Sequence, residues 1–225
     1  MMQPEEGSFG PEPPADAWLR GVPNVPGSGA GSPDPLILAQ YNPGGGPLPA
    51  PTRQSPETDS SPGEIVVLPD GSTITDAKSP TGYVMSPRAD LRDVAAKGRQ
   101  IGETFRDMLA NPEAAAGASA YLYTALGLNV GQGGTYDHQR RGNMITGYTQ
   151  FRHFRPIANV NVGLLGQQAG LTLEEILGVA GMYARLRSSN ADESRLYGLD
   201  PRTLHYITRG YEIGQSGMFD QPSSR

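Results

Sequence analysis

The chain has 225 residues, with 18 basic and 23 acidic side chains, a formal net charge of −5 at pH 7 and no cysteine. The lack of cysteine excludes a disulfide framework, a cysteine-ligated zinc or iron–sulfur site and a thiol nucleophile. No stretch approaches about 18 consecutive apolar residues, so the sequence predicts no membrane-spanning helix.

The N-terminal part differs from the rest in composition. Residues 1–78 hold 15 of the 21 prolines, 11 of the 30 glycines, 3 basic and 10 acidic residues. Pro and Gly at this level without a period are typical of low-complexity sequence, so residues 1–62 are predicted to be a disordered tail or linker. The first 20 residues lack a basic start and an apolar centre, so we expect no classical signal peptide. One apolar island, Leu36, Ile37, Leu38 and Tyr41, is either incidental or a docking peptide.

Residues 63–78 are predicted to form a small β-hairpin. Ile65-Val66-Val67-Leu68 is rich in β-forming residues, Pro69-Asp70-Gly71-Ser72 is a turn signal, and Thr73-Ile74-Thr75 is β-branched again. A lone two-stranded hairpin is marginal in water, so this one must pack against the rest of the chain or fray.

Residues 79–218 are predicted to form a mainly α, compact multi-helix domain with a net charge of +2. Apolar residues recur at steps of three and four over 87–110, which predicts an amphipathic helix with Ser86 as its N-cap. A second helix is expected over about 112–127. Thr172 and Glu175 have the spacing of a capping box at the start of a third helix, and Asp200-Pro201 predicts the start of a fourth. Residues 128–156 contain no long strand run.

Polar residues cluster first between Gly133 and Asn143. Asp137, His138, Arg140 and Arg141 lie within five residues, where they could supply a base, an acid and a phosphate clamp. The alternative is a solvated loop of turn residues. The three histidines have no metal-binding spacing, so neither a metal site nor another cofactor is predicted.

A second cluster is Asn159-Val160-Asn161-Val162-Gly163. Its two amides can bond a sugar, a base or a backbone, or one of them can be a helix N-cap, with Gly163 allowing tight packing. Arg140, Arg141, Arg152 and Arg155 also interleave with Tyr136, Tyr148, Phe151 and Phe154. This mixture is typical either of nucleic-acid binding or of arginines that cover buried rings.

In these segments the sequence resembles the bacterial polymorphic-toxin type 44 domain, a C-terminal toxin module of secreted bacterial effectors. The segments that carry the resemblance are Gly134–Gln139, Ala158–Gly163, Val179-Ala180-Gly181 and Gly198–Arg202, in the family's order over roughly 134–214. Two departures from the family pattern are valines at 160 and 162, where aromatics are common, and Gln139, where a basic residue is expected.

The resemblance implies an antibacterial effector that cleaves RNA in a target cell and is matched by a cognate immunity protein. Asp137 would be the acid–base group or would orient one, with His138 as its partner, and Arg140 and Arg141 would stabilise charge on the phosphate. The residues expected to bind substrate are Tyr136, Gln139, Asn143, Asn159, Asn161, Gly163 and Asp200. Such a protein would be made in the cytoplasm and exported by a specialised secretion system.

Two other functions stay open on the sequence alone. A peptidoglycan hydrolase acting in the periplasm would need a pair of carboxyl groups, which Asp137 with Glu174, Glu175 or Asp200 could supply. The third possibility is a non-enzymatic helical module that binds a partner helix.

Overall fold

The computed structural model describes residues 63–143, 147–187 and 194–220, so the predicted tail over 1–62 lies outside the described part of the chain. The described part is mainly helical, which confirms the predicted fold class. Its helices are α2 (Arg92–Ala110), α3 (Ala115–Val130), α4 (Arg155–Gln168), α5 (Leu173–Arg187) and α6 (Pro201–Gln215). Two antiparallel strand pairs join β1 (Glu64–Ile65) to β2 (Met85–Ser86) and β3 (Arg140–Asn143) to β4 (Gly147–Gln150). Short 3-10 turns are η2 (Arg152–Phe154) and η3 (Leu196–Gly198).

Helix α4 is the centre of the fold. It contacts α2, α3, α5 and α6, and nearly every residue from Pro156 to Gly166 is buried. A helix that is covered on all sides needs apolar or small residues around its whole circumference. The helix begins at Arg155, so Asn159 and Asn161 lie inside it and neither is an N-cap.

The closest helix contact is between α4 and α6. A Cβ added at Gly163 would collide with the carbonyl oxygen of Ile207, and one added at Gly210 would collide with that of Val160. The two backbones therefore touch directly, and glycine is required at both positions because any side chain would force the helices apart.

Helices α4 and α6 run in the same direction. Near their N-terminal ends the guanidinium of Arg155 donates to the hydroxyl of Thr203 at 2.9 Å. Near their C-terminal ends the side chain of Gln167 lies against Gly214. The two N-termini are therefore at the same end of the pair. The chain that connects α4 to α6, which includes α5, returns to that end.

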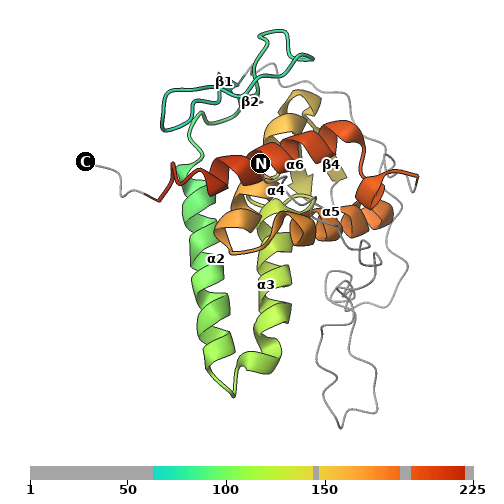
Figure 1. Ribbon diagram of the computed structural model, residues 1–225. Helices are drawn as coiled ribbons and strands as arrows, with labels where there is room; N and C mark the ends of the chain where they lie inside the picture. Colours follow the sequence, from blue (N-terminus) through green and yellow to red (C-terminus); the bar gives the residue numbers. More distant parts are fainter. Residues whose placement is uncertain (1–62, 144–146, 188–193, 221–225) are drawn as a thin grey trace, which may run out of the picture. The chain divides into compact units, whose positions relative to one another are not determined.

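Helix α2 packs on α4 in a similar way. A Cβ added at Gly98 or Gly102 would lie 2.6 Å from the carbonyl oxygens of Leu165 and Ala169, respectively. Figure 1 shows α2 and α3 side by side as a helical hairpin. Helix α2 starts at Arg92 rather than at 87, because Ser86 belongs to β2 and is fully buried.

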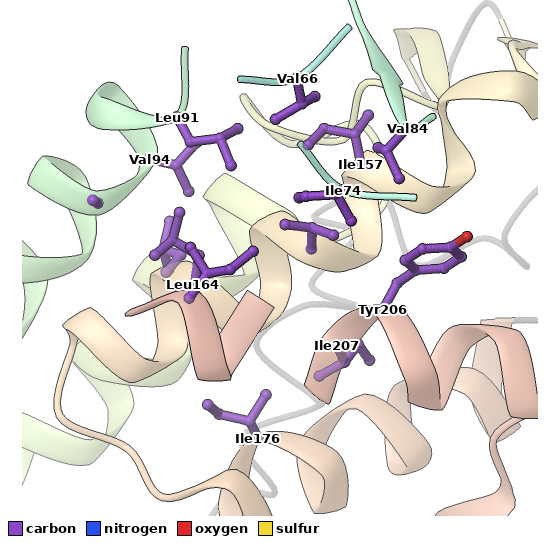
Figure 2. Packing of buried hydrophobic residues seen from close by; sticks show 14 of the residues in the cluster. Val66, Ile74, Val84, Leu91, Val94, Ile157, Leu164, Ile176, Tyr206 and Ile207 are labelled. Atoms are coloured by element: carbon purple, nitrogen blue, oxygen red, sulfur yellow. The ribbon is translucent and has the colours of Figure 1, made fainter. Parts of the chain in front are cut away.

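The segment before α2 packs onto the helices. Val67 pairs with Thr73 around the predicted turn, while β1 pairs with β2 further along the chain, so the segment is larger than the predicted hairpin. Figure 2 shows side chains of this segment in one cluster with side chains of α4 and α6: Val66, Ile74 and Val84 with Ile157, Leu164, Tyr206 and Ile207.

One buried ion pair ties this segment to α6. The carboxylate of Asp76 is 5% exposed and accepts a hydrogen bond from Arg202 at 2.7 Å. Burial and the neighbouring Asp76 carboxylate raise the pKa of Tyr206 to about 12, so this phenol stays protonated. The segment is thus held by charge as well as by apolar packing.

Candidate functional site

The first cluster forms a loop between α3 and β3, residues 131–139, which we call the Asp137 loop. Hydrogen bonds anchor it to surrounding elements. The amide of Tyr136 donates to the carbonyl of Asn129 at 2.7 Å, and the hydroxyl of Tyr183 in α5 accepts from the amide of Gln132 at 2.9 Å. Contacts at several points along the loop restrict its conformations.

The buried side chain of Asp137 holds this loop together through hydrogen bonds. Its carboxylate is 1% exposed and accepts from the amide of Gly133 at 2.7 Å and from the guanidinium of Arg140 at 3.0 Å. A buried carboxylate needs such partners to remain charged. The structure therefore brings Asp137 and Arg140 together as an ion pair.

His138 follows at the half-buried edge of the loop. Burial lowers its pKa, the Asp137 carboxylate opposes that change, and the positive charge of Arg88 adds to it. The imidazole is therefore neutral at pH 7, in the form that can accept a proton. The ring of Tyr136 meets it edge-on, with 6.5 Å between the centroids.

The arginines of the cluster have different environments. Arg140 is neutralised by Asp137, whereas Arg141 is exposed, with its guanidinium carbon 5.3 Å from the centre of the Phe151 ring. Phe151 and Phe154 are buried in the core, so neither offers a ring face to a nucleic-acid base. Arg141 thus covers a buried ring, as one of the two interpretations of this segment expected.

Other predicted residues of this region lie nearby. Gln139 is half-buried, and its carbonyl accepts from the amide of Phe151 at 2.8 Å, which joins the loop to the end of β4. Asn143 is the last residue of β3.

The two asparagines of α4 lie on opposite sides of the helix, because two residues correspond to about 200° of rotation. Asn161 is fully buried, and its Nδ2 donates to the carbonyl of Tyr136 at 3.1 Å, so it holds the Asp137 loop. Asn159 is one turn after Arg155 and one turn before Gly163, on the side that faces α6. The Nδ2 of Asn159 and the Oδ1 of Asn161 are buried without a hydrogen-bond partner in the described structure.

Asp200 belongs to a separate cluster at the start of α6. Its two carboxylate oxygens accept from the amides of Arg202 and Thr203 at 3.2 Å and from the Thr203 hydroxyl at 2.7 Å. Arg155 of α4 forms an ion pair with the same carboxylate. These bonds occupy the carboxylate, which is the N-cap that Asp200-Pro201 predicted. Burial alone would raise the pKa of Asp200, but these partners hold it below its usual value.

The Asp200→Ala variant is expected to lose about 2 kcal/mol of unfolding free energy at pH 7, because both the cap and the Arg155 partner disappear. Asp200→Asn should lose less, since asparagine is an equally good N-cap. A carboxylate with a lowered folded pKa contributes stability above the unfolded pKa of about 4 and loses it as the pH falls through the folded value. Urea unfolding at pH 7 and at pH 3 should therefore show a smaller difference between wild type and Asp200→Ala at pH 3, and an undiminished difference would contradict this account.

The structure adds residues to the site that the sequence did not indicate. The hydroxyl of Tyr136 donates to the backbone carbonyl of Asp93 at 3.2 Å, so the start of α2 lies beside the Asp137 loop. Arg88 forms a 3.6 Å ion pair with the carboxylate of Asp93. Tyr136 and Asp93 are 43 residues apart, and no local pattern links them.

Across the three described ranges, no group of three or more His, Cys, Asp or Glu side chains is placed to hold a metal ion. No helix among them is long and apolar enough to cross a membrane. Comparison with family models, with curated proteins and with solved structures found no match.

Proposed function

We propose that the protein is an antibacterial effector that cleaves RNA at the Asp137 loop. The observation that carries this proposal is the position of His138 at the edge of a loop anchored by Asp137, where burial lowers the pKa of its imidazole. The similarity of segments within 134–214 to the type 44 toxin domain supports the same function.

The charge of the surrounding sequence favours a polyanionic substrate. Residues 138–173 contain four arginines and no acidic residue. Two of these arginines, Arg140 and Arg155, are neutralised by Asp137 and Asp200. The side chains of Arg141 and Arg152 are exposed, and the guanidinium carbon of Arg141 lies 5.3 Å from the centre of the Phe151 ring. A segment with more arginines than acidic residues attracts phosphate groups.

In the proposed reaction His138 takes the proton of a ribose 2′-hydroxyl. The 2′ oxygen then bonds to the adjacent phosphorus while the bond from phosphorus to the 5′ oxygen breaks, and that oxygen leaves with a proton from water. The products are a 2′,3′-cyclic phosphate and a free 5′-hydroxyl. Asp137 serves this reaction by fixing the loop and Arg140, because its buried carboxylate is already paired.

The His138→Asn variant is expected to lower RNA cleavage on the order of 100-fold or more, because the base is removed. His205→Asn is the matched control, since His205 is exposed on α6 and lies outside the Asp137 loop. In the wild type, activity should fall only below the ordinary histidine pKa of about 6.5, where the imidazole becomes protonated. Cleavage of a labelled single-stranded RNA from pH 5 to pH 8 measures both effects, and full activity in His138→Asn would exclude this role.

Expression of the full chain in a bacterium tests the wider proposal. Toxicity that needs the cytoplasm, accompanied by degraded total RNA, is the expected result. Toxicity only after direction to the periplasm, with cell rounding, would replace the nuclease with a cell-wall hydrolase. A cell-wall hydrolase would need a second carboxyl group close to Asp137. Among the acids considered for that role, Glu175 is hydrogen-bonded to Thr172 in the cap of α5.

A further inference from the structure

We propose that Arg88 and His138 together bind one phosphoryl group, with Arg88 supplying the positive charge and His138 an N–H donor. The biological ligand, an RNA phosphate, rests on the proposed function. The site itself would also bind inorganic phosphate, which allows the two ideas to be tested separately.

The contacts of Asp93 bring Arg88 to the Asp137 loop, close enough for its charge to act on His138. Its backbone carbonyl accepts from the hydroxyl of Tyr136 at 3.2 Å, and its carboxylate lies 3.6 Å from the guanidinium of Arg88. The ring of Tyr136 in turn meets that of His138. Arg88 is thereby placed at the Asp137 loop although it is 50 residues away in sequence.

Arg88 is more available to an anion than Arg140. The Arg140 side chain is 21% exposed and its charge is neutralised by a carboxylate at 3.0 Å. The Arg88 side chain is 78% exposed, and its partner Asp93 is 75% exposed at 3.6 Å. An exposed pair of this kind is weak, so the guanidinium can exchange Asp93 for a phosphate at little cost. Guanidinium groups bind phosphate through two parallel N–H donors.

His138 complements this charge. A neutral imidazole has one N–H donor and one acceptor nitrogen, so it can donate to a phosphate oxygen or accept the proton of a nearby hydroxyl. The charged groups that act on it are Asp137, which is buried in its pair with Arg140, and Arg88. The acid paired with Arg88 is Asp93, whose carboxylate the phosphate would displace, and the carboxylate of Glu64 lies at the neighbouring amide of Ala89.

The test compares Arg88→Gln with Arg92→Gln in the full chain. Arg92 is the matched control, because it is also an exposed arginine near the start of α2 but pairs with Asp90 at 3.0 Å. Imidazole proton signals are followed by NMR during titration with inorganic phosphate, and the His138 signal is assigned from its loss in His138→Asn. Phosphate should shift the His138 signal, and Arg88→Gln should weaken phosphate binding about tenfold while Arg92→Gln leaves it unchanged.

Equal phosphate binding by Arg88→Gln and wild type would overturn the inference, as would a His138 signal that phosphate does not move. Cleavage assays distinguish the inferred phosphate site from the proposed function. RNA cleavage by the wild type with an unchanged KM in Arg88→Gln would retain the nuclease and reject the phosphate site. Phosphate binding that depends on Arg88 in a protein that leaves RNA intact would retain the site and reject the nuclease.

Discussion

Gly163→Ala is expected to destabilise the fold by about 3 kcal/mol, because the added methyl group has no space between α4 and α6. The Cβ would collide with the backbone carbonyl of Ile207, and backbone cannot move aside as a flexible side chain can. The helices would have to separate, which would also disturb the contact between Gly210 and Val160 on the same face. Urea unfolding followed by circular dichroism measures the loss.

Gly127→Ala is the matched control for this prediction. Gly127 is also inside a helix, but it is exposed on α3 and a Cβ there would meet nothing within 4 Å. Alanine is the better helix former, so this variant should gain about 0.5–1 kcal/mol. Two Gly→Ala changes of opposite sign would show that packing rather than helix propensity sets the effect. A stabilised Gly163→Ala would contradict the close contact of the two helices.

Asp137→Asn is expected to lower the unfolding free energy by about 3 kcal/mol, because removing one charge of a buried pair leaves the other without compensation. The neutral amide also accepts less strongly from Gly133 and Arg140, so the loop that carries His138 loosens. RNA cleavage should therefore fall together with stability. Thermal and urea unfolding of the purified variant measure the first effect.

Arg140→Gln and the double variant Asp137→Asn/Arg140→Gln separate the ion pair from the loop geometry. If the pair carries the effect, the double variant should be more stable than the sum of the two single losses implies. Full stability with lost cleavage in Asp137→Asn would instead make Asp137 a direct participant in the reaction. Equal activity and stability to the wild type would remove Asp137 from both roles.

Local signals in the sequence were sufficient for several elements. The period of three and four residues identifies α2, because one side of that helix faces the core and the other faces solvent. The capping box at Thr172 and the Asp200-Pro201 cap are formed as predicted, because each uses residues only two or three positions apart. Such interactions depend little on the rest of the fold.

Helix α4 was not predictable in the same way. Its surroundings bury all its sides, so its sequence has no polar face to reveal a helical period. Without that period, Asn159 and Asn161 suggested either a cap or a paired binding motif. The observed helix separates them, with Asn161 at the Asp137 loop and Asn159 toward α6.

The surroundings of the candidate site depend on long-range packing. The sequence placed Asp137, His138, Arg140 and Arg141 together because they are neighbours in the chain. It does not indicate Arg88 or Asp93, which lie near the loop because α2 packs against α3 and α4. Contacts between segments this distant leave no periodic or capping signal in a single sequence.

The segment before α2 is bound to helix α6, and this contact determines when the core can form during synthesis. Asp76 and Arg202 are 126 residues apart, and the apolar side chains around Val66 share one core with those of Ile207. A ribosome delivers the partners of the first segment only when α6 emerges, so the core cannot close on a growing chain. Long-range contacts of this kind slow folding. The core therefore stays incomplete until α6 has been synthesised, and a product truncated before α6 lacks one side of that core.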